Sequence, residues 1–383
     1  MGKQDEQLTL LEAIEGLPDP RVDRTRRHRL GDILVIAICG ALCSVDNWVE
    51  LERFGRAKEA WFRTFLELPN GIPSHDTFGR VFAALDQTAF RECFLRWVMS
   101  WGEALRATQI SLDGKALRGS VDSANGKAAI HMVSAFATEA GLALGQIKVD
   151  EKSNEITAVP ALLRMLHLKG CIVTVDALNC QRETAKTIVE QGGDYALALK
   201  DNQKTLCADV ALYFDAVRRR ELEQEAGGFE ETVEAGHGRV EVRQYWYTTD
   251  IKWLAERKNW KGLAGIGLAR RERTLNGKTS VEETCYLSSM ATQDAARFAR
   301  VVRSHWGIEN KLHWILDMAF DEDHCRVRTG NAAANFAVVR HLALNLLKQE
   351  RSVKVGIKCK RKMCGWDHPY LLKVLSGKPV LEG

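Results

Sequence analysis

Two aspartates follow two short apolar segments, and their positions could support metal chemistry. Asp113 follows residues 109–112, and Asp176 follows residues 171–175. Where neighbouring strands are parallel, their carboxyl ends meet at one edge of the sheet, and active sites form there. Two carboxylates at such an edge can share Mg²⁺, which prefers oxygen ligands and keeps water for substrate phosphates. Two such ions about 4 Å apart can activate a nucleophile and stabilise a leaving oxygen in phosphoryl transfer.

Each aspartate also has a simpler explanation. Asp113 precedes Gly114 and can cap a turn, and Asp176 can cap the helix expected after it. Acids at strand ends are common, so either one alone favours capping. The pair together favours a metal site.

A third group of chemically active side chains lies in residues 305–314. His305, Glu309, His313 and Asp317 recur every four residues, which predicts one face of a helix. The two histidines and Glu309 allow a zinc site as an alternative. Three ligands on one straight helix converge poorly on a tetrahedral ion, so we rank zinc lower. The plainest interpretation is a charged stripe, with Trp306 and Trp314 in the core.

Alternating and periodic apolar residues predict the elements that carry these side chains. Residues 1–105 are expected to be helical. The next part predicts the order β-β-β-α-β-α-β, with strands at 109–113, 130–136, 142–149, 171–176 and 195–199 and helices at 156–168 and 181–191. From about 200 to 290 we expect a β-rich insertion, with a helix at 204–220 and strands at 240–248, 263–271 and 284–288. Helices at 295–317 and 332–348 follow, and the remainder is basic and loosely patterned.

Composition limits the class of protein. The chain has 383 residues, 45% of them hydrophobic and 27% charged, with a net charge of +4. This mild basicity means that any nucleic-acid contact must come from local clusters. No apolar run is long enough to span a membrane and the N-terminus lacks a signal-peptide core, so we expect a cytoplasmic protein. The ten cysteines form no CxxC pair, which argues against a disulfide framework and a zinc ribbon.

Several ordered segments carry a resemblance to a known family. They are residues 112–118 (LDGKALR), 150–156 (DEKSNEI), 176–177 (DA), 192–195 (GGDY) and 305–314 (HWGIENKLHW). Together with residues 27–30 (RHRL) and 71–77 (GIPSHDT), they closely resemble the H-repeat-associated branch of the bacterial DDE transposases of insertion sequences. The resemblance covers nearly the whole chain and is more specific than one short motif.

The resemblance implies a fold and a catalytic triad. It implies an α/β protein with an RNase H-like mixed-sheet core and a β-rich insertion, in agreement with the strand order above. We expect a helical N-terminal domain with DNA contacts at 1–105, the catalytic domain at 106–348 with its insertion at about 200–290, and a basic tail at 349–383. The family pattern makes Asp113, Asp176 and Glu309 the catalytic residues and the ligands of Mg²⁺, for which Mn²⁺ can substitute.

The implied reaction is phosphoryl transfer without a covalent enzyme intermediate. Water attacks the phosphodiester at the end of the element, and the freed 3′-hydroxyl then attacks target DNA. Positioning and charge neutralisation would supply most of the rate. The implied partners are double-stranded DNA, as terminal inverted repeats and as target, and a second copy of the chain when two DNA ends are paired.

One feature departs from the related transposases, which often carry an arginine four residues before the glutamate and a lysine seven residues after it. These positions hold His305 and Leu316 here. Arg303 and Lys311 are the candidates to replace them at the DNA end, together with His305 itself.

Basic clusters predict where DNA phosphates would bind. Residues 21–29 hold five arginines, and we assign phosphate contacts to Arg24, Arg26, Arg27 and Arg29, with a solvated loop as the alternative. Lys115 and Arg118 follow Asp113 closely, and the family resemblance implies that they neutralise phosphates beside the metal ions, with ordinary turn residues as the alternative. Lys200 and Lys204 could line the groove, but simple solvent exposure is the first interpretation for them. The basic residues of the tail from Lys348 to Lys362 form a second candidate patch.

Three other functions remain open from the sequence. A metal-dependent nuclease without strand transfer would use the same carboxylates, and only a joining assay separates it from a transposase. A catalytically silent, domesticated DNA-binding protein is the second alternative. The zinc-hydrolase alternative predicts stoichiometric zinc that is lost when His305 or His313 is mutated.

Overall fold

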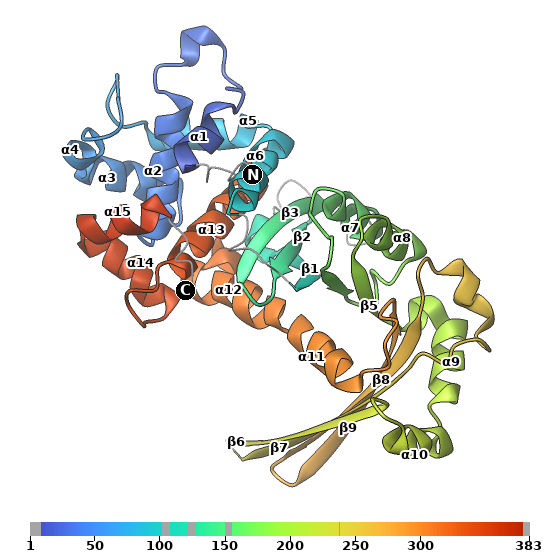
Figure 1. The fold of residues 1–383 in the computed structure, drawn as a ribbon. Coiled ribbons are helices and arrows are strands. Elements are labelled where there is room, and N and C mark those ends of the chain that lie inside the picture. Colours follow the sequence, from blue (N-terminus) through green and yellow to red (C-terminus); the bar gives the residue numbers. More distant parts are fainter. Residues whose placement is uncertain (1–8, 102–107, 122–127, 150–154, 237, 378–383) are drawn as a thin grey trace, which may run out of the picture. The chain divides into compact units, whose positions relative to one another are not determined.

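A computed structural model describes residues 9–101, 108–121, 128–149, 155–236 and 238–377 (Figure 1). Backbone contacts divide the chain into two compact units. Unit 1 comprises residues 1–106, 114–152 and 309–383, and unit 2 comprises residues 107–113 and 153–308. The units are therefore discontinuous in sequence, whereas the sequence suggested three consecutive parts. The boundary expected at 105 and most of the segment 150–156 lie outside the described residues.

Unit 2 is built on a mixed sheet with the strand order β1-β4-β5-β9-β8-β7-β6. Its strands are β1 (Gln109–Leu117), β4 (Ile172–Val175), β5 (Asp194–Ala198), β6 (Phe229–Gly236), β7 (Arg239–Thr248), β8 (Gly265–Leu275) and β9 (Lys278–Ser288). β1, β4 and β5 are parallel, and β9 pairs antiparallel with β5. β6 to β9 form an antiparallel meander, so the β-rich insertion extends the core sheet.

The insertion differs from its prediction in three respects. β6, with the sequence FEETVEAG, was missed because it has too few apolar residues to stand out, and its ladder with β7 holds it. β8 and β9 are longer than expected because their polar ends pair with each other. The single helix expected at 204–220 is two helices, α9 (Lys204–Tyr213) and α10 (Ala216–Gln224). The break lies at Asp215, whose carboxylate accepts from the backbone N–H groups of Val217 and Arg218 and caps α10.

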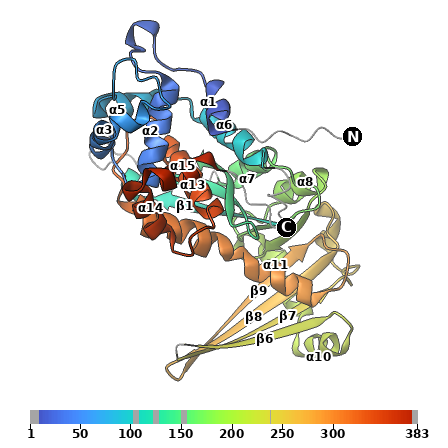
Figure 2. The ribbon, with the colours of Figure 1, turned by 60° about the vertical axis from the view of Figure 1, so that its left-hand side comes forward.

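Three further helices cover the sheet of unit 2, namely α7 (Glu155–Leu163), α8 (Arg182–Glu190) and α11 (Ala295–His305). α11 packs across β4, β6, β7 and β8 (Figure 2). Phe298 on α11 stacks on Tyr247, with ring centroids 5.2 Å apart. Its ring also covers Gly267, where a Cβ atom would lie 2.4 Å from the ring. Gly267 thus allows α11 to approach the sheet.

Unit 1 is mainly helical. Its helices are α1 (Leu10–Glu15), α2 (Leu30–Leu42), α3 (Trp48–Ala57), α4 (Glu59–Phe62), α5 (His75–Ala84), α6 (Gln87–Met99), α12 (Trp314–Phe320), α13 (Ala332–Gln349), α14 (Ile357–Trp366) and α15 (His368–Ser376). The hairpin of β2 (Ile130–Ala137) and β3 (Leu142–Val149) joins them.

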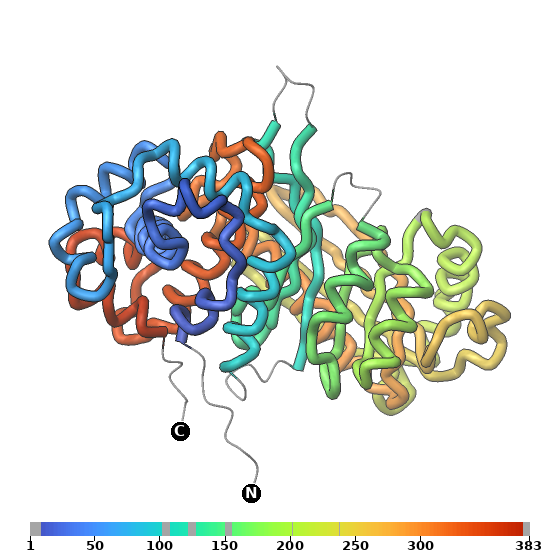
Figure 3. The backbone as a smooth tube through the Cα atoms, turned by 90° about the horizontal axis from the view of Figure 1, so that it is seen from above, coloured from blue at the N-terminus to red at the C-terminus, as the bar shows by residue number. Residues whose placement is uncertain are grey.

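Helix α13 is the core of unit 1 and contacts α2, α5, α6 and β3 (Figure 3). Two asparagines on it are fully buried and hydrogen-bonded. Asn345 pairs with both the backbone N–H and the carbonyl of Ala143 on β3, at 2.9 and 2.8 Å. Asn335 donates to the carbonyls of Phe82 and Leu85 near the end of α5. These bonds satisfy both ends of the Asn345 amide and the side-chain N–H groups of Asn335, which burial would otherwise penalise. Oδ1 of Asn335 is buried and makes no hydrogen bond within the described residues.

Strand β1 belongs to both units. In the sheet, the first five strands have the order β3-β2-β1-β4-β5. β2 and β3 are antiparallel, and β1, β4 and β5 are parallel. This arrangement, with the helical N-terminal region, confirms the predicted α/β class and its RNase H-like mixed sheet. Within the described ranges, no helix has the length and apolar character needed to cross a membrane.

The C-terminal segment is folded, and the prediction of a loosely patterned basic tail was wrong. Residues 357–376 form α14 and α15. Arg361 is 1% exposed and donates to the carbonyl of Ala41 at 2.8 Å and to the carboxylate of Asp46 at 3.0 Å. Lys360 is also buried and donates to the carbonyl of Leu347 at 3.0 Å. These two cations bind groups within unit 1, so the patch expected on the tail loses two of its members.

Candidate active site

The pairing of β1 with β4 gives Asp113 and Asp176 equivalent positions. Leu112 pairs with Val175 in a parallel register, so the two aspartates are the next residues along each strand. Two residues earlier, the hydroxyl oxygens of Ser111 and Thr174 lie 3.0 Å apart. Because side chains alternate along a strand, the same register carries that face through the aspartates. Asp113 does not end its strand, as the sequence suggested, since β1 continues to Leu117.

Helix α11 covers this face of the sheet in unit 2. The side-chain amide of Gln109 donates to the carbonyl of Val301 at 2.9 Å. Nδ1 of His305 lies 2.9 Å from the hydroxyl oxygen of Thr174. Burial among protein atoms lowers the pKa of His305 to about 4, although the charge of Asp176 opposes this shift. His305 is therefore neutral at physiological pH and cannot act there as a cation.

Asp176 is held by a turn. The backbone N–H and the side-chain amide of Asn179 both donate to its Oδ1 atom, at 3.1 and 2.8 Å. Helix α8 begins only at Arg182, so Asp176 caps the intervening turn and leaves the helix uncapped by it. The capping function weighed from the sequence is thus present for the turn. The turn fixes the carboxylate of Asp176, and this is compatible with a role of Asp176 in metal binding.

The helix expected at 295–317 is interrupted. α11 ends at His305, Glu309–His313 form a π-helical turn, and α12 begins at Trp314. Such turns interrupt regular helices and often mark functional sites. The interruption breaks the straight stripe predicted from the four-residue spacing. The charged-stripe interpretation placed Trp306 and Trp314 in the core, but their side chains are 60% and 58% exposed.

The π-helical turn joins Glu309 to His313. The carboxylate oxygen Oε2 of Glu309 lies 3.1 Å from Nδ1 of His313, and His313 is buried whereas Glu309 is exposed. The hydrogen bond with His313 lowers the pKa of Glu309, and the positive charge of Lys115 adds to this effect against the cost of burial. Glu309 is therefore a carboxylate in the neutral pH range.

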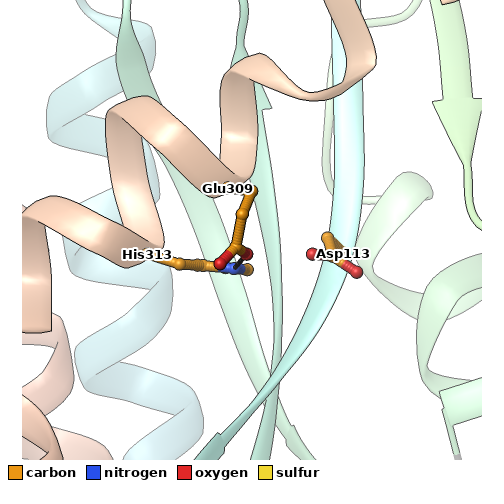
Figure 4. Close-up of side chains that lie close together, drawn as sticks. All are labelled: Asp113, Glu309 and His313. Atoms are coloured by element: carbon orange, nitrogen blue, oxygen red, sulfur yellow. Dashed lines mark hydrogen bonds and ion pairs between the residues drawn. The ribbon is translucent and has the colours of Figure 1, made fainter. Parts of the chain in front are cut away.

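Asp113, Glu309 and His313 form a group that could hold a metal ion. Each offers one ligand atom, and these atoms lie within 4.8 Å of one another (Figure 4). The group differs from the zinc site weighed above, which required His305, and it contains His313 in the place where the family pattern has Asp176.

Lys115 is held by acidic side chains in unit 1. Its ammonium contacts the carboxylate of Asp317 and lies 3.0 Å from Glu322 and 3.9 Å from Asp323. Burial opposes the charged form, but the charge of Glu322 and the hydrogen bond to Asp317 raise the pKa of Lys115. With only 12% of its side chain exposed, Lys115 is oriented toward these carboxylates. This arrangement does not fit the phosphate contact expected from the sequence.

The other basic candidates for DNA contacts are exposed, and some of them are in ion pairs. The exposed ones in unit 1 are Arg24, Arg26, Arg27, Arg29, Arg118 and Lys311, and those in unit 2 are Lys200, Lys204 and Arg303. Several are already in ion pairs. Arg26 pairs with Asp19 and Asp23, Arg29 with Glu67, Arg118 with Asp323, and Arg303 with Glu234. A phosphate would therefore compete with a carboxylate at those four arginines.

Sequence reasoning missed some partners of these residues. His313 was considered only as a zinc ligand beside His305 and Glu309, and nothing linked it to Asp113. The acidic run at 321–323 is a visible signal that a buried cation lies nearby, but it did not identify Lys115. Neither Asn179 nor Thr174 carries a sequence signal for its role, because each acts through a hydrogen bond made by the fold.

Comparisons with known proteins identify the family of this chain. Residues 82–346 match the family model of the transposase DDE domain, and residues 11–98 match a DDE_Tnp_1-associated region. The chain belongs to the DDE transposase family. This family member is 38% identical to the "H repeat-associated putative transposase YhhI" of Escherichia coli (strain K12), over 96% of this chain and 98% of that protein. It is also 38% identical to the "Putative transposase YncI" of Escherichia coli O157:H7, over 96% and 94% of the two chains.

A solved structure of the piggyBac transposase synaptic complex with hairpin DNA is a weaker match. The TM-score is 0.42 at 10% sequence identity, over 97% of this DDE transposase and 78% of that chain. A likeness of this size carries no argument about the site. The assignment to the family rests on the sequence matches.

Proposed function

We propose that this DDE transposase binds the terminal repeats of an insertion sequence, cleaves the DNA at the element ends and joins them to target DNA, using a divalent metal ion. The observation that carries the proposal is the grouping of Asp113, Glu309 and His313 within 4.8 Å. The position of Asp176 supports it, because Asp176 and Asp113 each follow the last paired residues of β4 and β1, Val175 and Leu112.

The donor set fits a divalent ion. Asp113 and Glu309 would supply hard carboxylate oxygens, as Mg²⁺ requires, and Asp176 would be the third carboxylate. His313 orients Glu309 through its hydrogen bond or supplies a nitrogen ligand, which Mn²⁺ accepts more readily than Mg²⁺. When bound, the ion would activate water and neutralise charge on the phosphate.

The side chains around this group prepare it for that chemistry. His313 and Lys115 keep Glu309 ionised, and Asn179 orients Asp176. The neutral His305 is hydrogen-bonded to the hydroxyl of Thr174 and adds no charge beside the aspartates. These residues hold the carboxylates in one geometry, which is the contribution that phosphoryl transfer needs from a protein.

The DNA contacts are proposed for exposed basic residues. They are Arg24, Arg26, Arg27 and Arg29 of the N-terminal helical part, Arg118 and Lys311 near the site residues in sequence, and Lys200, Lys204 and Arg303 of unit 2. Such contacts give sequence-independent, salt-sensitive affinity. We assign Lys115 a positioning role in place of a phosphate contact. Two copies of the chain would act together, because two DNA ends must be paired.

The test is a combined cleavage and joining assay. A labelled duplex carrying the element's terminal repeat and a target plasmid are incubated with Mg²⁺ or Mn²⁺ and the wild type, Asp113→Asn, Asp176→Asn or Glu309→Gln. Glu190→Gln, an exposed acid on α8, is the matched control. We expect the wild type and control to cut and join, and the three variants to bind DNA without doing either. Cleavage without joining would make the protein a nuclease, and binding without cleavage would make it a silent DNA-binding protein.

A further inference from the structure

Unit 1 contains a pocket that the proposed cleavage chemistry does not use. Its volume is about 690 Å³, and its lining comes from residues 47–49, 75–84 and 326–332. All of these residues are well separated in sequence from the carboxylates of the active site. A pocket of this size lies within the range of about 300–1,000 Å³ that is typical of small-molecule sites.

The charge of the lining favours an anion. Arg80, Arg326 and Arg328 line the pocket, against one acid, Asp76. Arg328 is anchored by a hydrogen bond from its Nε to the carbonyl of Gly119 at 3.0 Å. Arg80 and Arg326 are exposed, and within the described part of the chain neither has an ion-pair partner. A ligand phosphate could therefore bind them without displacing a protein carboxylate.

Three helices begin at the pocket. The first residues of α3, α5 and α13 all belong to its lining. The N-terminus of a helix carries a partial positive charge and backbone N–H groups that favour an anion. The helix N-termini and the arginines therefore both favour the binding of an anion, and they are two separate features of the pocket.

The lining also offers one flat aromatic side chain, Trp48. The indole of Trp48 is half-buried and lies 5.0 Å, centroid to centroid, from both Phe82 and Phe336. Gly79 of α5 faces it, since a Cβ atom built there would be 3.5 Å from the indole Cδ1. The missing side chain of Gly79 leaves the indole accessible from the pocket. A base could pack against this surface, because every base has a flat π face.

We propose that this pocket binds a single unpaired nucleotide, with its phosphate at Arg80 and Arg326 and its base against Trp48. A bare phosphate would leave most of the volume empty, and an apolar ligand would leave the arginines unused. The source that we favour is an unpaired nucleotide at the end of the DNA on which the protein acts, which rests on the function proposed above. A free mononucleotide offers the same chemistry.

The test compares two DNA duplexes by fluorescence anisotropy, without metal. One is blunt, and the other carries a few unpaired nucleotides at its end. The variants are Gly79→Leu, which fills the pocket, and the double variant Arg80→Ala/Arg326→Ala, which removes charge at exposed positions and should leave the fold intact. Arg53→Ala, an exposed arginine of α3 outside the lining, is the matched control. Binding of a free deoxynucleoside monophosphate is measured in parallel by ligand-observed NMR.

We expect the unpaired nucleotides to increase the affinity of the wild type by about tenfold. Both pocket variants should lose this increase and keep the affinity for blunt DNA, while Arg53→Ala keeps both. An increase that survives in Gly79→Leu and in the double variant would overturn the proposal, and so would equal binding of the two duplexes by the wild type. If neither duplex binds but the mononucleotide binds and Gly79→Leu abolishes this, the nucleotide pocket stands and the proposed DNA function fails.

Discussion

His313 and Glu309 are joined across one π-helical turn, with Nδ1 of the buried imidazole 3.1 Å from Oε2 of the exposed carboxylate. The histidine limits the orientations of the carboxylate and keeps it ionised. Partners of this kind around a metal ligand usually matter for metal affinity. The pair therefore links a local distortion of the helix to the chemistry proposed for the site.

The first prediction concerns this pair. We expect His313→Ala to raise the Mg²⁺ concentration needed for half-maximal DNA cleavage by about ten- to a hundredfold. His313→Gln, which retains a hydrogen-bonding side chain, should have a smaller effect. His324→Ala is the control, because His324 is a highly exposed histidine of the same unit. An unchanged metal requirement in His313→Ala would refute the role given to His313.

The second prediction concerns Asn179, which is buried and donates two hydrogen bonds to Asp176. The side-chain bond is lost in Asn179→Ala, while the backbone bond is retained. We expect cleavage to fall by about tenfold or more because the carboxylate is less well positioned, with a loss of about 1 kcal/mol in the free energy of unfolding. Single-turnover cleavage and urea unfolding measure the two effects. A loss of stability with full activity would make Asn179 a purely structural residue.

The third prediction separates Lys115 from Arg118. Lys115→Met removes the cation that faces Asp317 and the buried Glu322. Breaking a buried pair by removing one partner costs about 3–5 kcal/mol, so urea unfolding should show a large loss of stability. Arg118 has 81% of its side chain exposed, so Arg118→Met should leave stability nearly unchanged and weaken DNA binding. The reverse pattern would restore Lys115 as a phosphate contact.

The fourth prediction concerns pH. The ammonium of Lys348 lies 2.6 Å from the carbonyl of Lys311 in the π-helical turn and 2.5 Å from that of Gly141. Burial lowers the pKa of Lys348 to about 7, and the charge of Lys311 contributes. An unfolded lysine has a pKa of about 10.4. Between these two values the unfolded chain binds the proton that the folded chain has released.

The stability that Lys348 contributes is therefore lost as pH falls toward 7 and is fully present above about 10.4. The difference in free energy of unfolding between the wild type and Lys348→Met should grow with pH in this window, by at most about 1.4 kcal/mol per pH unit. Urea unfolding at several pH values measures it. Lys354→Met, at an exposed lysine of the same unit, should show no such slope, and a flat difference for Lys348→Met would contradict the prediction.

The fold was predictable where short-range patterns decide it. The strands before Asp113 and Asp176 were recognised because apolar runs of that length are typical of buried strands, and the parallel register then gives the two acids equivalent positions. β6 was missed because its polar sequence has no such pattern and its ladder with β7 holds it. α14 was missed because Lys360 and Arg361 suggest a solvated surface, although the fold turns both cations inward to carbonyl groups.

The sequence by itself determined the family and the order of the core strands, and it singled out the acids proposed for the site, because these depend on residue type and on spacing along the chain. Only the tertiary structure decided what each side chain contacts. It buried Lys115 against Asp317, 202 residues away, and grouped Glu309 and His313 with Asp113. Contacts between residues so distant in sequence depend on how helices and strands pack, and a local pattern contains no information about that packing.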